Sequence, residues 1–332
     1  MVFKRLLGSL GVGGPTVDTV LDPGPVLPGG TLSGQVRLRG GGTDADIENI
    51  TLELVARVET EYGDGEGEGT VSFARFTVGG GFRLAAGEHR DVPFGVTLPW
   101  ETPVTELHGQ PLGIGLGVRT ELAVSGARDK GDLDPLAVAP LPVQEAVLEA
   151  LGRHGFGFRS ADLEHGRIHG TGQRLPFYQE IELTAGPRYA HVLNELEVTF
   201  LAHPDETEVI LEADKPAGFF AAGQDVVNRQ VVGHEGVAHR DWTEVVGAWL
   251  DQVTAGRGHA SDGHASDGHV PHGHASHGHG HGHGHGSGPG MGAVVAAGAV
   301  GVAVGVAGGL VAAEVVDEVG DFFEGEGEDD EG

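Results

Sequence analysis

The chain of 332 residues contains no cysteine. Disulfides, thiolate nucleophiles and cysteine-based zinc sites are therefore excluded together, and the compartment cannot be inferred from redox chemistry. Basic residues are also scarce, since 20 Lys plus Arg stand against 49 Asp plus Glu and leave a net charge of −29. A nucleic-acid binder needs clustered cations to neutralise phosphate, so no nucleic-acid partner is expected. Aromatic residues make up only 6% of the chain, which disfavours a sandwich hydrolase or sugar-binding module with an aromatic-lined surface.

Glycine is abundant, at 60 residues, and the charge is unevenly distributed. All Lys and Arg lie at or before Arg257, while 12 acidic residues follow it, so residues 1–257 carry 37 − 20 = 17 net negative charges. A length of about twice the usual domain predicts two domains followed by tails. We place the end of the folded part near residue 257.

Residues 1–138 have a β pattern after the N-terminal segment. The longest run, 47–62, places Ile50, Leu52, Leu54, Ala56 and Val58 on one face, with Thr51, Glu53, Val55, Arg57 and Glu59 facing mostly outward. Turn residues separate the runs at intervals typical of an all-β sandwich. The expected strands cover 17–21, 32–39, 47–62, 71–78, 82–85, 92–98 and 114–124.

Residues 139–257 are expected to form a second β-sandwich. An acidic, proline-containing loop at 129–142 and a short helix at 143–151 connect it to the first domain. Strands are expected at 156–168, 176–183, 193–201 and 207–213, with a hairpin turn at 203–206. A closing helix at 241–251 begins with a capping-box pattern, Asp241 and Glu244. Trp242 and Trp249 share its apolar stripe, which indicates either packing or a partner groove.

The N-terminal segment predicts an amphipathic helix over 2–11. Phe3, Leu6, Leu7 and Leu10 recur at helical spacing beside two basic residues. The apolar run is too short for a signal peptide. The helix therefore either packs on the domain edge or touches a membrane surface.

Residues 258–290 form a low-complexity linker that contains ten of the 19 histidines and cannot build a core. Imidazoles at mixed spacings would bind zinc, nickel or copper weakly, although no cofactor is required. The alternative is a flexible linker that changes charge near pH 6.5. The candidate metal ligands are His259, His264, His269, His272, His274, His277, His279, His281, His283 and His285.

Residues 291–332 comprise an uncharged stretch, 291–313, and an acidic tail. The stretch is long enough to cross a bilayer, and its small residues every fourth position, among them Gly301, Gly305 and Gly309, suit close helix contacts. Against a membrane span stand its many glycines and the missing interfacial anchors. Membrane association, self-association and disorder remain open for this segment.

Motifs of enzyme chemistry are missing from the sequence. The histidines of 234–239 are five residues apart, not the four of a zinc-protease helix, and no Walker A or nucleophile-elbow pattern occurs. The sequence therefore offers no nucleophile, general base or cofactor-binding loop, and no enzymatic activity is predicted.

Six separate segments carry a resemblance to a known family. They are 72–76 (SFARF), 92–99 (VPFGVTLP), 102–105 (TPVT), 129–135 (DKGDLDP), 177–182 (FYQEIE) and 194–200 (NELEVTF). Matching in order, these segments resemble the bacterial sporulation-control (Spo-zero-M) family. The resemblance covers about residues 1–257 and omits the histidine tract. It implies an arrestin-like fold of two β-sandwich domains and a role in sporulation, cell division and envelope events, without enzymatic activity.

The leading hypothesis is a cytoplasmic, partly membrane-associated, non-enzymatic scaffold or regulator that works through protein contacts, with division or envelope proteins as partners. Its acidic domains would steer it toward basic partners. The rival hypothesis is a metal-buffering protein that acts through the tract His259–His285.

Overall fold

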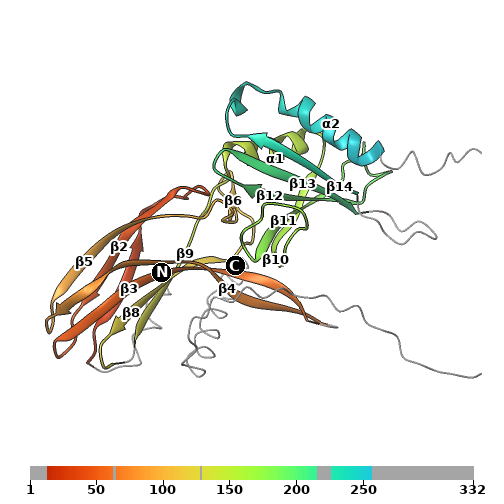
Figure 1. Ribbon diagram of the computed structural model, residues 1–332. Helices are drawn as coiled ribbons and strands as arrows, with labels where there is room; N and C mark the ends of the chain where they lie inside the picture. Colours follow the sequence, from red (N-terminus) through yellow and green to blue (C-terminus); the bar gives the residue numbers. More distant parts are fainter. Residues whose placement is uncertain (1–12, 63–64, 128, 215–225, 256–332) are drawn as a thin grey trace, which may run out of the picture.

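The computed structural model describes residues 13–62, 65–127, 129–214 and 226–255 (Figure 1). The predicted N-terminal helix, the histidine linker and the tail lie outside these residues. None of the helices described is long and apolar enough to cross a membrane.

The first unit is a β-sandwich, as predicted. One sheet contains β1 (Thr16–Leu21), β2 (Thr31–Arg39) and β5 (His89–Thr97) in the order β1-β2-β5. The facing strands are β4 (Gly65–Leu84), β3 (Ala45–Tyr62), β8 (Leu116–Val124) and β9 (Lys130–Pro135). Both sheets contribute to one hydrophobic core, and a small hairpin, β6 (Glu106–Leu107) with β7 (Gln110–Pro111), lies beside them.

Strand β3 confirms the predicted inward face, because its five expected core residues, Ile50 to Val58, are all fully buried. The other face is more covered than expected. Glu53 is only 5% exposed because arginines flank it, and Val55 is covered near Gly117, where Leu133 of β9 packs. Side chains of neighbouring strands bury this second face of β3, and the alternation of residues within β3 does not reveal that burial.

Two expectations for the first unit were wrong. The expected loop at 129–142 contains strand β9, which pairs antiparallel with β8 and places Asp132 within 2.6 Å of the backbone nitrogen of Thr19. Pairing with neighbours stabilises this extended segment despite its acids and proline. The separate strands expected at 71–78 and 82–85 are one strand, β4, which continues through the intervening glycines along β3.

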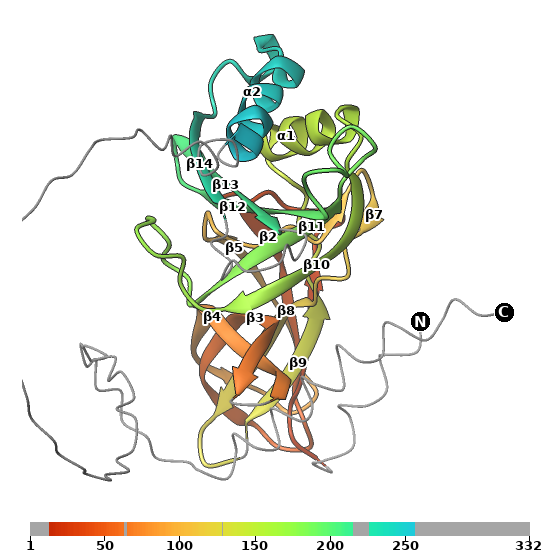
Figure 2. The ribbon, with the colours of Figure 1, turned by 90° about the vertical axis from the view of Figure 1, so that its right-hand side faces the viewer.

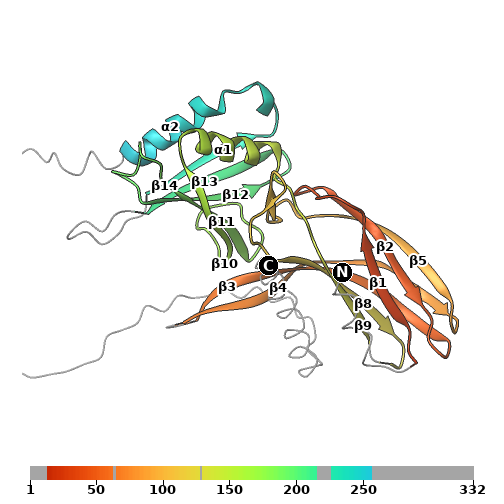
Figure 3. The same ribbon diagram turned by 180° about the vertical axis from the view of Figure 1, so that it is seen from behind.

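The second unit consists of one antiparallel sheet with helices on one face (Figures 1 and 3). Its elements are α1 (Pro142–Arg153), β10 (Gly157–His165), β11 (Phe177–Thr184), β12 (Glu195–Ala202), β13 (Glu206–Asp214), β14 (Val226–Gly233), the short 3-10 helix η3 (Val237–His239) and α2 (Trp242–Ala255). The mostly-β architecture of two tandem units is confirmed. In this unit the layer that faces the sheet is made of α1 and α2, which share its core, and no second sheet takes that place among the described residues. Strand β14 was not anticipated from the sequence.

Both helices begin where the sequence indicates. Pro142 is at the first position of α1, where its missing N–H costs nothing. A carboxylate oxygen of Asp241 accepts hydrogen bonds from the backbone nitrogens of Thr243 at 3.0 Å and Glu244 at 3.1 Å, which confirms the predicted cap. Helix α2 continues to Ala255, one turn beyond the predicted end.

The two units share one large sheet. Strand β10 pairs in parallel with β3, with Glu164 opposite Glu59, and the far end of the β3–β4 ribbon runs below the second unit in Figure 1. Phe73 of β4 and Phe177 of β11 meet edge to face with ring centres 5.5 Å apart. Side chains from the second unit thus complete the core of the first. The boundary at 138/139 stays a prediction.

Candidate functional site

The sheet of the second unit has an acidic face opposite its helices. Alternate residues of each strand, such as Ile181, Val198 and Leu211, point into the helical core, so their neighbours lie on the other face. The strand register places two rows across this face. One row contains Ser160, Glu182, Glu197 and Glu212, and the other contains Asp162, Glu180, Thr199, Ile210 and Arg229.

Burial and mutual repulsion make these carboxylates hard to ionise. Burial, followed by the charges of Glu197 and Asp162, raises the pKa of Glu180 to about 8. The pKa of Glu197 rises to about 7, through burial and the charge of Glu212. Burial together with Glu59 raises the pKa of Asp162 to about 6. Each raised pKa means that ionising the carboxyl group costs free energy on this face, a cost that a neighbouring positive group would reduce.

A hollow of about 270 Å³ opens on this face. Tyr178 and Ile210 supply apolar surface, while Glu180, Glu197 and Glu212 supply acidic groups. The guanidinium of Arg229 also lines the hollow and donates a hydrogen bond to the backbone carbonyl of His169. The lining therefore combines acidic groups with apolar surface, which suits a Lys or Arg side chain with its aliphatic stem.

In the part of the chain that the structure describes, two groups of side chains have the donor types of a metal site. Asp162, Glu164 and Glu180 each bring a carboxylate oxygen within 4.8 Å of the others, a set that a hard cation would accept. His108 approaches Glu145 and Glu149 of α1 from the turn between β6 and β7, with its Nδ1 3.1 Å from Glu145. The second group is explained as a direct contact between the units, because the imidazole reaches Glu145 at hydrogen-bond distance.

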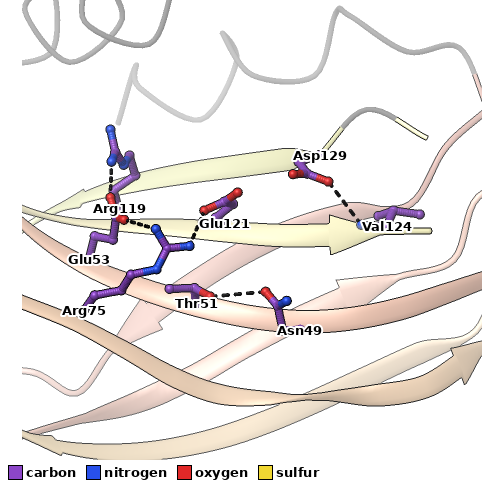
Figure 4. A network of polar contacts seen from close by, with 8 residues as sticks. All are labelled: Asn49, Thr51, Glu53, Arg75, Arg119, Glu121, Val124 and Asp129. Atoms are coloured by element: carbon purple, nitrogen blue, oxygen red, sulfur yellow. Dashed lines mark hydrogen bonds and ion pairs between the residues drawn. The ribbon is translucent and has the colours of Figure 1, made fainter. Parts of the chain in front are cut away.

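A second polar network lies on the first unit (Figure 4). Glu53 accepts from Arg75 at 2.6 Å and from Arg119, and Arg75 also reaches Glu121 at 3.0 Å. The four side chains come from three neighbouring strands, β4, β3 and β8. The ion pairs of this network join the three strands. Because its two glutamates balance its two arginines, the network has no net charge to offer a ligand.

Among the described residues, Thr207 and His234 have the types of a nucleophile and a base. The hydroxyl of Thr207 lies 2.8 Å from Nε2 of His234, but Thr207 is fully buried, and the imidazole packs against Trp100. A substrate could not reach that hydroxyl, so the contact joins β13 to the segment after β14.

The residues singled out from the sequence are only partly covered by the structure. Trp242 and Trp249 are each 6% exposed and meet edge to face in the core of the second unit, which favours packing over a partner groove. Phe3, Leu6, Leu7 and Leu10 lie outside the described residues, as do the ten histidines of 259–285 and Gly301, Gly305 and Gly309.

The sequence did not single out the acidic face. A usable signal was the alternation of Glu with apolar residues at 180 and 182 and at 195 and 197. That alternation shows only that the glutamates share a face of each strand. Their gathering depends on which strands become neighbours.

Comparisons with known proteins show one consistent relationship. A family model described as "SpoOM protein", Spo0M, matches residues 3–217. The sporulation-control protein Spo0M of Bacillus subtilis is 37% identical over 217 residues, which cover 65% of this chain and 81% of that protein. The crystal structure of Bacillus subtilis Spo0M aligns with a TM-score of 0.64 at 31% identity, over 73% of this chain and 100% of that one.

Proposed function

The chain belongs to the Spo0M family of sporulation-control proteins, with its arrestin-like fold, and on that premise we propose that it is a non-enzymatic regulator that works by binding other proteins. The acidic sheet face of the second unit is its proposed contact surface. The observation that supports it most directly is the crowding of Asp162, Glu180 and Glu197 on adjacent strands, where burial and the neighbouring carboxylates raise the pKa of each group.

A basic segment of a partner protein fits this face best. A Lys or Arg side chain in the hollow would neutralise the repulsion between carboxylates, and Tyr178 and Ile210 would cover its stem. The same charge disfavours nucleic acid as the ligand, since phosphate would be repelled. The relative is a sporulation-control protein, and we extend that role to this chain, together with a scaffold role in cell division.

A charge-matched comparison tests the surface. The triple variant Glu180→Gln, Glu197→Gln and Glu212→Gln removes three carboxyl groups from the face, and binding is compared at pH 9, above the pKa of about 8 of Glu180. The control triple variant Asp22→Asn, Glu48→Gln and Asp91→Asn removes three charges from exposed positions of the first unit. Binding of a fluorescent oligolysine peptide to the full-length chain is measured by anisotropy.

The face variant should bind the peptide at least tenfold more weakly, with a change within about twofold for the control. Equal weakening in both variants would mean that the peptide senses only overall charge, and the proposed surface would be withdrawn. Crosslinking in the native cells then identifies the partner, and division or envelope proteins are the proposed class.

The other proposals concern residues outside the described part of the chain. Metal buffering by His259–His285 is tested by calorimetry with zinc or nickel on the full chain and on a 259–285 deletion. Membrane association through 291–313 is tested by comparing how the full chain and a 291–313 deletion partition between membrane pellet and supernatant. Self-association through the same segment is tested by comparing the oligomeric states of the two proteins.

A further inference from the structure

A groove of about 600 Å³ lies on the helical side of the second unit, away from the acidic face. Its lining residues come from α1 and from the segment that contains η3 and the start of α2. Figures 1 and 2 show α1 and α2 side by side in this part of the molecule. Its volume is in the range of pockets that bind drug-sized ligands. Ala146, Val237 and Trp242 supply its apolar surface.

The charged groups of this groove are mostly basic, in a chain of net charge −29. Arg153 and Arg240 line it with His234 and His239, and Glu149 is the only acidic residue in its lining. Glu149 pairs with Arg153 at 2.7 Å. Arg240 lies 5.2 Å above the ring of Trp242, and no carboxylate pairs with it in the described part of the chain. One exposed guanidinium therefore remains available for an acidic ligand.

The sequence of this chain contains a segment of complementary chemistry. Residues 314–324, EVVDEVGDFFE, place Val315, Val319 and Phe322 at intervals of four and three, with acidic residues between them. This is the spacing with which helices present apolar anchors to a groove. Residues 314–332 contain ten acidic residues and no basic ones. We propose that residues 314–324 dock into the groove between α1 and η3 of the same chain, with their apolar side chains on Ala146 and Val237 and their carboxylates at Arg240 and Arg153.

The connecting chain is long enough for this contact. Residues 256–313, 58 in number, separate the end of α2 from the segment. A flexible chain of that length spans about 40 Å on average, and α2, with 14 residues, is about 21 Å long. The groove at the start of α2 is therefore within reach. Tethering gives an effective concentration up to the millimolar range, so a weak contact suffices.

The docked segment would cover the basic groove with the chain's own acidic residues. Residues 1–257 carry 17 net negative charges, so this part of the chain as a whole repels the acidic tail. A partner with a stronger acidic segment, or high salt, would release the tail. This inference does not depend on the proposed role of the acidic sheet face, and it would stand if that face proved not to bind a partner.

The absence of native cysteines makes a disulfide test simple. The full-length double variant Ala238→Cys and Gly325→Cys places one thiol at the exposed rim of the groove and one directly after the segment. The control pair, Glu48→Cys with Gly325→Cys, uses an exposed position of the first unit. The rate of intramolecular disulfide formation under mild oxidation is compared for the two pairs by gel shift after proteolysis.

The groove pair should crosslink at least tenfold faster than the control pair, and 0.5 M NaCl or Arg240→Glu should remove most of the difference. Phe322→Ala with Phe323→Ala should have the same effect. Adding Asp321→Lys to Arg240→Glu should restore the fast rate. Equal rates for the two pairs, or disulfides formed only between chains, would overturn the proposal.

Discussion

The side-chain amide of Gln179 hydrogen-bonds both backbone groups of Val104. The nitrogen of Val104 donates to Oε1 at 2.9 Å, and Nε2 donates to the carbonyl of Val104 at 2.8 Å. Gln179 belongs to β11 of the second unit, whereas Val104 is buried in the first. One side chain thus joins the units in the way that a backbone pair joins two strands.

Removing this amide should weaken the joint between the units. Gln179→Ala leaves both backbone groups of Val104 without their partner, and we expect the free energy of unfolding in urea to fall by about 1–3 kcal/mol. The control, Gln110→Ala, changes an exposed glutamine of β7 and should cost much less. Equal losses for the two variants would show that the amide pair contributes nothing specific.

The acidic face should make stability depend on pH. The pKa of Glu180 in the folded chain is about 8, above the ordinary value of 4.5, so the unfolded chain releases this proton more readily. Its contribution to stability is present below about pH 4.5 and is lost as pH rises toward 8. Glu180→Gln should raise the free energy of unfolding at pH 8 by about 1–2 kcal/mol, a figure reduced for coupling to Glu197, with no gain at pH 4. Denaturation with urea at both pH values measures this, and Glu48→Gln, at an exposed position, is the control.

Glu53 should be the most sensitive member of the network on the first unit. Its side chain is 6% exposed and pairs with both Arg75 and Arg119. Glu53→Ala leaves a partly buried arginine without its partner, and we expect a loss of about 2–3 kcal/mol in unfolding free energy. Glu121→Gln removes the more exposed partner of Arg75 and should cost less than about 1 kcal/mol. Similar costs would mean that burial of Glu53 has no energetic consequence.

Substituting Trp249 distinguishes the two roles considered for the apolar stripe of α2, packing in the core and docking of a partner. Because the indole is buried in the core of the second unit, Trp249→Ala should create a cavity that costs about 3–5 kcal/mol. Trp249→Phe retains most of the volume and should cost less. Thermal and urea unfolding measure both. Wild-type stability in the alanine variant would support a docking role.

Gly29 should tolerate substitution less well than Gly24. Both have positive φ, +70° and +98°, so a side chain is strained at either position. A Cβ at Gly29 would also lie 2.5 Å from the ring of Trp100, which packs against the core of the second unit, whereas nothing lies within 4 Å at Gly24. Gly29→Ala should therefore cost about 1–3 kcal/mol more than Gly24→Ala in unfolding free energy and shift the tryptophan fluorescence. A difference below that range, with an unchanged spectrum, would contradict the role of Trp100 as an anchor between the units.

Local patterns in the sequence were enough for much of the fold. The alternation in 47–62 identified the buried face of β3, Pro142 identified the start of α1, and Asp241 identified the start of α2. Each of these features depends on residues within a few positions of one another. The turn at 203–206 joins β12 and β13 as predicted, with the nitrogen of His203 bonded to the carbonyl of Glu206.

Only the tertiary structure decided the rest. Strand β9 is extended because β8 lies beside it, and α1 and α2 take the place expected of a second sheet because their apolar stripes cover one face of β10–β14. The acidic face also depends on strand order, since Glu180 and Glu197 lie on adjacent strands. Their raised pKa values arise from burial and repulsion between residues far apart in sequence. The sequence determined which residues are acidic and apolar, and packing determined which of them meet.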